Sequence, residues 1–233
     1  MKGVFGRFFL AVSFAMFFSL SCGYQPEQSM LVKAISENNV QEVKALLSNP
    51  QVIRRELNPR QNSSLPKPII LATVKRNNEI VKLLVEAGAD TNVDDGKDTG
   101  DTPLILSMMT NNDELVEFLI DHGADVNKPN NFGITPFWGA SVNQNIEYVK
   151  LCIANGANID QFGRAHDPLR QYEQIIGGIT PLMMASFQGN IEIIKLLIES
   201  GASKDLKDFL GRSALVYAGV AKKEPVIELL KNK

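Results

Sequence analysis

Few side chains in this 233-residue sequence have the type and spacing that chemistry requires. The two histidines, His122 and His166, lie in different segments of the chain, so a shared metal site would need a fold that brings them together. The sequence contains no glycine-flanked serine nucleophile with His and Asp partners, and no Gly-rich phosphate loop followed by Lys. We therefore predict no catalytic residue, no metal site and no cofactor, and expect that the protein is not an enzyme.

An acidic stretch shows part of the spacing of a calcium-binding loop. Asp90, Asn92 and Asp94 alternate as oxygen ligands would, and Asp101 falls twelfth. The glycine of such a loop comes one place late, as Gly96, and the twelfth residue is not Glu. We interpret the stretch as a hairpin tip with solvated carboxylates, and calcium binding is the alternative.

A pair of turn residues recurs along the chain at constant spacing. Pro is followed 20 residues later by Gly-Ala in four pairs, which are Pro68 and Gly88, Pro103 and Gly123, Pro136 and Gly156, and Pro181 and Gly201. Successive prolines are 35, 33 and 45 residues apart, and Ala214 follows Pro181 by 33. A period near 33 is typical of stacked helical hairpins, which usually bind other proteins.

Each repeat unit predicts two short helices. Proline suits the first turn of the first helix, because its missing N–H has no partner there. The second half of each unit places apolar residues at helical spacing, over residues 40–47, 80–85, 115–120, 146–153, 191–198 and 226–230. The recurring glycines fall where the second helix should end in a left-handed residue. Six units starting near residues 29, 67, 102, 135, 180 and 213 thus predict an all-α domain over 29–233.

The repeated segments resemble ankyrin repeats. The similarity rests on Gly-Ile-Thr-Pro at 133–136 and 178–181 and on Gly-Ala-Asp-x-Asn at 88–92 and 123–127. It implies a solenoid of helix-turn-helix units with short β-hairpin fingers, which binds a protein through its concave face. The usual His after Thr-Pro-Leu is replaced here, and we expect its replacement Trp138 to fill the seam between units. The first and last units lack the Pro and Gly landmarks, which suits end units with water-tolerant outer faces.

The same resemblance assigns residues that contact the partner. On the first helices it selects Met109 and Phe187, and at the fingertips it selects Phe132 and Phe209. An exposed apolar patch of this kind is typical of a protein-binding surface. The alternative is that the two fingertip phenylalanines fold back over their own hairpins.

An insertion interrupts the repeat period after Trp138. The extra residues, 161–177, lie where the family's β-hairpin finger projects. They include Arg164, His166, Arg170 and Tyr172, and Arg and Tyr are favoured where a few residues dominate an interface. We predict that this loop contributes to partner binding, and a tolerated insertion without a role is the alternative.

Residues 1–22 have the pattern of a secretory signal peptide. Lys2 and Arg7 precede an apolar run from Phe8 to Leu20 that is too short to span a bilayer comfortably. Ser21 stands directly before Cys22, which resembles a bacterial lipoprotein processing site and implies lipidation of Cys22. Ordinary cleavage near the same point is the alternative, and residues 23–28 form a short linker.

Cys152 is the second cysteine. It occupies the helical register of Leu84, Leu119 and Leu197, so we expect a small buried hydrophobe rather than a reactive thiol.

Charge narrows the choice of partner. Without Lys2 and Arg7 the chain keeps 22 basic residues against 26 acidic ones, a net charge of about −4, which does not favour nucleic acid or an anionic membrane surface. We predict a monomeric, non-enzymatic protein-binding module, lipid-anchored in the bacterial envelope as a scaffold or inhibitor. The alternative is a secreted effector or adhesin that binds a host protein.

Overall fold

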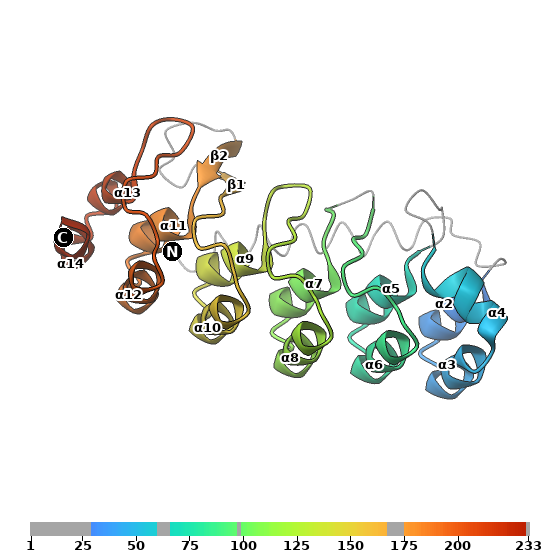
Figure 1. Cartoon of the computed structure of the whole chain (residues 1–233). Helices are drawn as coiled ribbons and strands as arrows, with labels where there is room; N and C mark the ends of the chain where they lie inside the picture. The colour runs from blue at the N-terminus through green and yellow to red at the C-terminus, as the bar shows by residue number, and fades with distance from the viewer. Residues whose placement is uncertain (1–28, 60–65, 97–98, 167–174, 232–233) are drawn as a thin grey trace. The chain divides into compact units, whose positions relative to one another are not determined.

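The computed structural model describes residues 29–59, 66–96, 99–166 and 175–231, with backbone alone for 164–166, 175 and 176. The chain divides into two compact units, unit 1 (Met1–Ala124) and unit 2 (Asp125–Lys233). In both units the described chain is mostly helical, and two short strands occur in unit 2 (Figure 1). The predicted all-α fold is confirmed.

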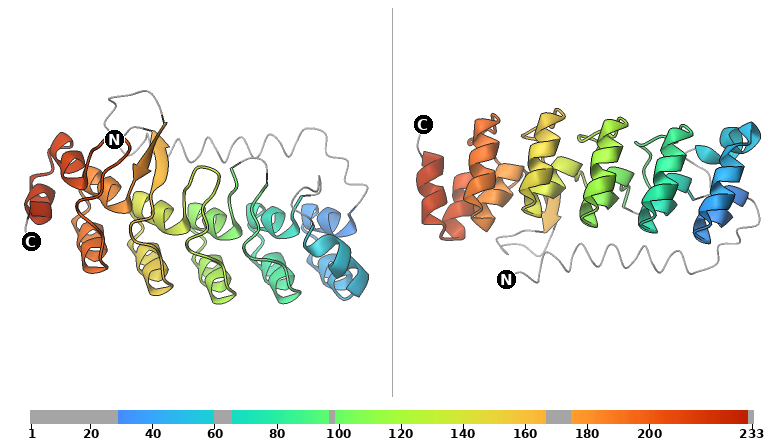
Figure 2. Two further views of the ribbon diagram at one scale, coloured as in Figure 1. Left: turned by 45° about the horizontal axis from the view of Figure 1, so that its top comes forward. Right: turned by 90° about the horizontal axis from the view of Figure 1, so that it is seen from below.

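Unit 1 is built from helix pairs, in which the first helices form one row and the second helices a parallel row (Figures 1 and 2). Its first helices are α2 (Met30–Ser36), α5 (Pro68–Val74) and α7 (Pro103–Met109), and its second helices are α3 (Val40–Leu47), α6 (Asn78–Glu86) and α8 (Asp113–Asp121). Two short segments follow α3, namely α4 (Pro50–Val52) and the π-helical η1 (Ile53–Leu57).

Unit 2 repeats the arrangement and adds a β-hairpin. Its helix pairs are α9 (Pro136–Val142) with α10 (Ile146–Ala154), α11 (Pro181–Gln188) with α12 (Ile191–Glu199), and α13 (Ala214–Val220) with α14 (Glu224–Lys231). The strands β1 (Gly163–His166) and β2 (Ile175–Ile179) lie between the first two pairs in sequence. The loops between pairs project to one side of the helices, and we call them fingers (Figure 2).

The Thr-Pro dipeptides start first helices as predicted. Proline takes the first helical turn, and the preceding threonine hydroxyl accepts a backbone N–H three residues on. These bonds join Thr102 Oγ1 to Ile105 N (3.3 Å), Thr135 Oγ1 to Trp138 N (3.1 Å) and Thr180 Oγ1 to Met183 N (3.3 Å).

The turns within the pairs use asparagines that the sequence interpretation did not single out. Each second helix but α14 begins after an Asn whose side-chain oxygen accepts the N–H three residues later, at Asn39, Asn77, Asn112, Asn145 and Asn190. The residue before each cap has positive φ, and those residues are Asn38, Arg76, Asn111, Gln144 and Gly189. A non-glycine residue in this conformation is strained by about 1 kcal/mol, which the cap's hydrogen bond helps to offset.

The predicted glycines end the second helices of four pairs. Gly88, Gly123, Gly156 and Gly201 have φ of 95°, 84°, 79° and 94°. The alanine after each donates its N–H to the carbonyl five residues earlier, for example Ala89 to Leu84 (2.9 Å). This is the Schellman arrangement, which satisfies carbonyls that a helix end would leave without partners.

Asparagine side chains also tie successive finger bases together. Asn58 donates Nδ2 to the Gly88 carbonyl (2.9 Å), and its Oδ1 accepts the Asp90 N–H (3.0 Å). Corresponding bonds join Asn92 Nδ2 to Gly123 O (2.8 Å), Asn127 Nδ2 to Gly156 O (3.0 Å) and Asn158 N to Asn127 Oδ1 (2.7 Å). These bonds join an Asn side chain at one finger base to the backbone at the next. They therefore hold successive finger bases at a fixed spacing.

The first pair of unit 1 is covered by η1. Glu56 Oε2 accepts the Ser29 hydroxyl (2.7 Å) and the Leu31 N–H (2.9 Å), so a side chain of η1 holds the start of α2. Leu57 of η1 and Leu31 are both buried. The outer side of this pair is thus closed by the chain's own segment.

Candidate protein-binding surface

Two fingers of unit 2 are shaped by the same side-chain turn. In the first, Asn130 Oδ1 accepts the N–H groups of Phe132 and Ile134 at 3.0 Å each, and Gly133 has φ 75°. The backbone closes the loop through Asn130 N to Ile134 O (3.0 Å). A polar side chain bonded to its own loop rigidifies the tip.

The second finger repeats this turn with a carboxylate. Asp208 Oδ1 accepts the N–H of Leu210 (2.9 Å) and of Arg212 (2.8 Å), and Asp208 N donates to Arg212 O (3.0 Å). Gly211, φ 77°, takes the left-handed position. The equivalent tips are therefore residues 131–132 in the first finger and 209–210 in the second.

A buried polar triad fastens the second finger to α13. The other oxygen of Asp208, Oδ2, accepts bonds from Arg212 Nε and the Tyr217 hydroxyl, each 2.7 Å. Burial disfavours the charged carboxylate, but hydrogen bonds from Arg212 and Tyr217 outweigh it and lower the pKa of Asp208. Burial, with Asp208 beside it, raises the pKa of Tyr217. Asp208 is thus held ionised and Tyr217 neutral at neutral pH.

The described parts of the predicted insertion form a strand pair that lies, in sequence, between these two fingers. Strands β1 and β2 pair antiparallel, with Gly163 opposite Ile179 and Ala165 opposite Ile176, and an irregularity falls between 163 and 165. A Cβ on Gly133 would lie 3.9 Å from Gly163 Cα, so the first finger lies close beside β1. The three fingers of unit 2 therefore form neighbouring projections.

The Trp138 side chain packs against the β1–β2 hairpin. Its side chain is 2% exposed, and Nε1 donates to the Ile179 carbonyl (2.7 Å). A Cβ on Gly163 would come within 2.9 Å of the indole ring, so only glycine fits at that point of β1. The prediction that Trp138 fills a seam is confirmed, and the ring also anchors β2.

Phe209 lies across the base of the same hairpin. A Cβ on Gly177 or Gly178 would stand 2.5 or 2.7 Å from its ring, and Phe209 N donates to the Gly177 carbonyl (3.2 Å). Phe162 meets the ring edge-on, with centroids 5.9 Å apart at 68°. The sequence interpretation had not paired Phe162 with Phe209, although the glycine pair 177–178 leaves room for a ring.

These aromatic rings remain open to solvent despite their contacts. Phe209 is 68% exposed, Phe162 48% and Phe132 37%. Leu206 and Leu210 beside Phe209 are also exposed. We call Phe162, Phe209, Leu206 and Leu210 the aromatic finger patch. Phe209 packs on the preceding hairpin rather than on its own, so the alternative that it folds back over its own hairpin is wrong, and its contact with a partner stays a prediction.

The other residues predicted to contact a partner are either half-buried or have no described side chain. Met109, at the end of α7 in unit 1, and Phe187, on α11 in unit 2, are half-buried. Arg164 and His166 lie in β1, where the backbone alone is described. Arg170, Tyr172 and the predicted lipidation residue Cys22 lie outside the described residues.

The residues considered for chemistry have structural roles. The exposed ring of His122 contacts Phe118, and its Nδ1 is 2.8 Å from the Phe118 carbonyl at the end of α8. Cys152 is buried, and burial raises the pKa of its thiol to about 12, so almost no reactive thiolate exists near neutral pH. The prediction that Cys152 is a small buried hydrophobe is confirmed.

The acidic stretch uses its side chains in turns. Asp90 Oδ1 accepts the N–H of Asn92 (2.8 Å), and Asp94 Oδ1 accepts that of Gly96 (2.9 Å). Within the described residues, no three His, Cys, Asp or Glu side chains gather as a metal ion would require. The oxygens that suggested calcium binding thus shape the repeat's own loop.

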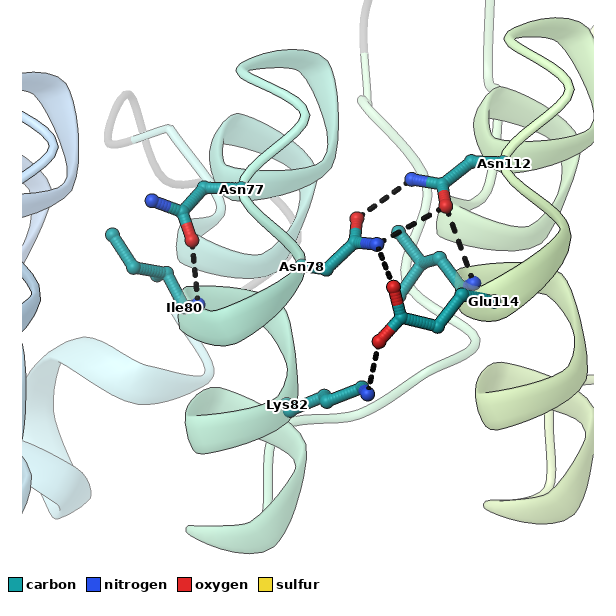
Figure 3. A network of polar contacts seen from close by, with 7 residues as sticks. Asn77, Asn78, Ile80, Lys82, Asn112 and Glu114 are labelled. Carbon is teal, nitrogen blue, oxygen red and sulfur yellow. Dashed lines mark hydrogen bonds and ion pairs between the residues drawn. The ribbon is translucent and has the colours of Figure 1, made fainter.

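On the second helices of unit 1, a polar network links neighbouring repeats (Figure 3). Asn78 Nδ2 bonds Asn112 Oδ1 (3.1 Å) and Glu114 Oε2 (2.8 Å), and Lys82 Nζ lies 2.5 Å from Glu114 Oε1. Hydrogen bonding from Lys82, then Asn78, lowers the pKa of Glu114. These groups satisfy one another, so the network holds the repeats in register.

Among the described helices, none is both long and apolar enough to cross a bilayer. A family model described as ankyrin repeats (3 copies) matches residues 8–95, 74–163 and 165–233. No curated protein matches the chain.

Proposed function

Because this chain belongs to the ankyrin-repeat family, whose members are generally protein-interaction modules, we propose that it is a non-enzymatic binding module whose aromatic finger patch recognises a protein. The observation that carries the proposal is the Phe162–Phe209 pair, held on glycine-lined backbone yet open to solvent. Exposed aromatic rings are favoured at the centres of interfaces.

Preorganisation supports this assignment. The turn at Asp208, the bond from Phe209 N to Gly177 O and the triad on α13 fix the backbone that presents Phe209. A partner would therefore immobilise few rotatable groups on binding, which reduces the entropic cost of association.

The remaining predicted contacts extend the same proposal. Phe132 lies on a neighbouring finger, Arg164 and His166 lie in β1, and Arg170 and Tyr172 belong to the same insertion but lie outside the described residues. We propose that these polar residues of the insertion also contact the partner. Met109 in unit 1 and Phe187 in unit 2, each at the end of a first helix, would each add an apolar contact with the partner.

The cellular setting is proposed from the sequence alone. Residues 1–22 would direct export, and a lipid on Cys22 would hold the monomeric protein at the bacterial envelope as a scaffold or inhibitor. The mass of the N-terminal peptide from producing cells tests the anchor. A lipid-modified Cys22 in the membrane fraction supports it, whereas an unmodified chain in the medium favours the secreted effector or adhesin.

Affinity capture tests the binding surface. The full-length protein, the double variant F162A/F209A and the control M30A are used as baits on the envelope fraction. Met30 is 60% exposed and apolar but lies on α2 in unit 1. We expect one protein to be retained by the parent and M30A and lost with F162A/F209A, while far-UV melts of all three agree. Equal retention by all three would refute the patch.

A further inference from the structure

The charged side chains of unit 1 are unevenly distributed along its helix pairs. Residues 29–59, which include the first pair and η1, carry four basic residues against three acidic ones. Residues 99–124, which include the last pair of this unit, carry five acidic residues and no Lys or Arg. The net charge of the whole chain, which does not favour an anionic membrane, hides this difference. An anionic surface would attract the first pair of unit 1 and repel its last pair.

Two arginines lie on the exposed side of η1. Arg54 and Arg55 are both exposed, whereas Val52 before them and Leu57 after them are buried. The buried residues hold the segment against the first pair, so the two guanidinium groups face solvent. Among the described residues, neither arginine has an ion-pair partner. Both are therefore available to an anionic group outside the protein.

The bonds of Glu56 place these arginines beside the start of the described chain. Glu56 directly follows Arg55, and its Oε2 accepts the Ser29 hydroxyl (2.7 Å) and the Leu31 N–H (2.9 Å). Lys33, one turn along α2 from Ser29, is also exposed. Three exposed cations thus lie around the start of α2. We call Lys33, Arg54 and Arg55 the basic end of unit 1.

A short segment separates this end from the cysteine proposed to carry a lipid. Six residues, 23–28, lie between Cys22 and Ser29. Since an extended chain spans at most about 3.5 Å per residue, the segment from Cys22 to Ser29 reaches about 25 Å at most. The attraction between exposed charges falls off within a Debye length, which is about 8 Å in physiological salt. A lipid on Cys22 would therefore keep the basic end of unit 1 within a few Debye lengths of the membrane surface.

We propose, on the basis of the lipid anchor proposed at Cys22, that the basic end of unit 1 binds anionic phospholipid headgroups of the same membrane. The guanidinium groups of Arg54 and Arg55 would bond phosphate oxygens, and Lys33 would add a point charge. Contacts that are weak alone would be populated because the anchor raises the local concentration of headgroups.

This contact would orient unit 1 on the membrane. The acidic helix α8, whose Glu117 and Asp121 are exposed, would be repelled by the surface that attracts η1. The row of helix pairs in unit 1 would therefore run away from the membrane rather than lie along it. The contact uses no residue of the aromatic finger patch.

Vesicles that supply their own anchor test the proposal. The chain from Cys22 to Lys233 keeps every described residue, and a maleimide lipid captures Cys22 selectively because Cys152 is buried. The vesicles contain phosphatidylcholine alone or mixed with phosphatidylglycerol, with a trace of lipid that carries a photoreactive headgroup. Mass spectrometry maps the lipid adducts after irradiation. On anionic vesicles we expect about fivefold more adducts over residues 29–57 than on neutral ones, and high salt should remove the excess.

Capture by maleimide does not require lipidation in the cell. The vesicle experiment therefore tests the basic end of unit 1, whereas the mass of the N-terminal peptide from producing cells tests the anchor. A failure of one is distinguishable from a failure of the other.

Charge-reversal variants test the residues. R54E/R55E should lose the excess of adducts over residues 29–57 and keep the melting temperature of the parent. K195E/K222E makes the same charge change at exposed positions of unit 2 and should keep the excess. Equal adduct yields on the two kinds of vesicle, or an equal loss in both variants, would overturn the proposal. Lipid adducts unchanged by R54E/R55E, with a protein lost from envelope capture, would also overturn it and assign the arginines to an acidic protein.

Discussion

The loop that Asp95 closes in unit 1 and the finger of residues 208–212 in unit 2 each use an Asp carboxylate, but over different spans and for different purposes. Both begin with an Asp whose carboxylate accepts loop N–H groups, from Gly100 to Asp95 (2.6 Å) and from Leu210 to Asp208 (2.9 Å). In unit 1 the loop closes on itself, because the Thr99 hydroxyl lies against the carboxylates of Asp95 and Asp101.

In unit 2 the carboxylate instead bonds Arg212 and Tyr217, and the tip lays Phe209 on the preceding hairpin. The difference shows that an Asp carboxylate can fix the backbone of either loop, whereas the groups around that carboxylate and the residues at the tip decide whether the loop is polar and self-contained or presents an aromatic ring.

The largest expected loss of stability comes from removing the Trp138 side chain, which supports the β1–β2 hairpin of unit 2. W138A should destabilise unit 2 by about 3–5 kcal/mol, the usual range for deleting a buried Trp. It should also speed amide exchange in β2, whose Ile179 carbonyl Trp138 holds. W138F keeps most of the volume and should cost about 1 kcal/mol for the lost hydrogen bond. Equal losses of unfolding free energy for W138A and W138F in urea titrations would contradict this separation of packing from hydrogen bonding.

The carboxylates of Asp208 and Asp95 should contribute unequally to stability. D208N breaks a buried ion pair and should cost about 3 kcal/mol, because Arg212 is left without its counter-charge. D95N in the half-buried finger of unit 1 should cost only about 1 kcal/mol. Chemical denaturation of both variants measures the gap. Losses of the same size would show that the triad adds nothing to the bonds that Asp208 makes with its own loop.

The stability of the parent and that of D208N should respond differently to acid. Since the pKa of Asp208 is lowered in the fold, its contribution is present above its unfolded pKa of about 3.9 and is lost as pH falls through the folded value. Parent stability should therefore decline below about pH 4 more steeply than that of D208N. Melting temperatures across pH 2–7 test this, and parallel acid limbs would argue against an ionised Asp208.

The smallest expected change in stability comes from the packing of the Phe209 ring against Gly178. Gly156 and Gly178 share φ 79°, but a Cβ meets no atom within 4 Å at Gly156 and the Phe209 ring at 2.7 Å at Gly178. G156A should cost about 1 kcal/mol for backbone strain alone, and G178A about 1–2 kcal/mol more. In an F209A background the gap should narrow but not close, because a Cβ at Gly178 would still lie 3.1 Å from Asp208 Cα. An unchanged gap would mean that the Phe209 ring does not restrain Gly178.

The helical frame could be predicted from the sequence because its signals are local. Pro103 and Gly123 act within their own turns, so their spacing alone placed one helix start and one helix end. The caps at Asn77 and Asn112 were equally local but were overlooked, since asparagines before Glu-rich helices resemble ordinary polar turns.

The aromatic pairing depends on long-range register. Phe162 and Phe209 meet only because Gly163 and Gly177 let the hairpin settle against Trp138 and the next finger. Repeat spacing placed each residue on a finger but could not show which rings touch.

Site-specific photo-crosslinking tests the central claim most directly. A photoreactive phenylalanine analogue replaces Phe209 in one full-length variant and Met30 in another, and both are irradiated in the producing cells. The account predicts one discrete protein adduct at position 209 and none at position 30. The same adducts at both positions, or an adduct at position 30 alone, would contradict recognition through the aromatic finger patch.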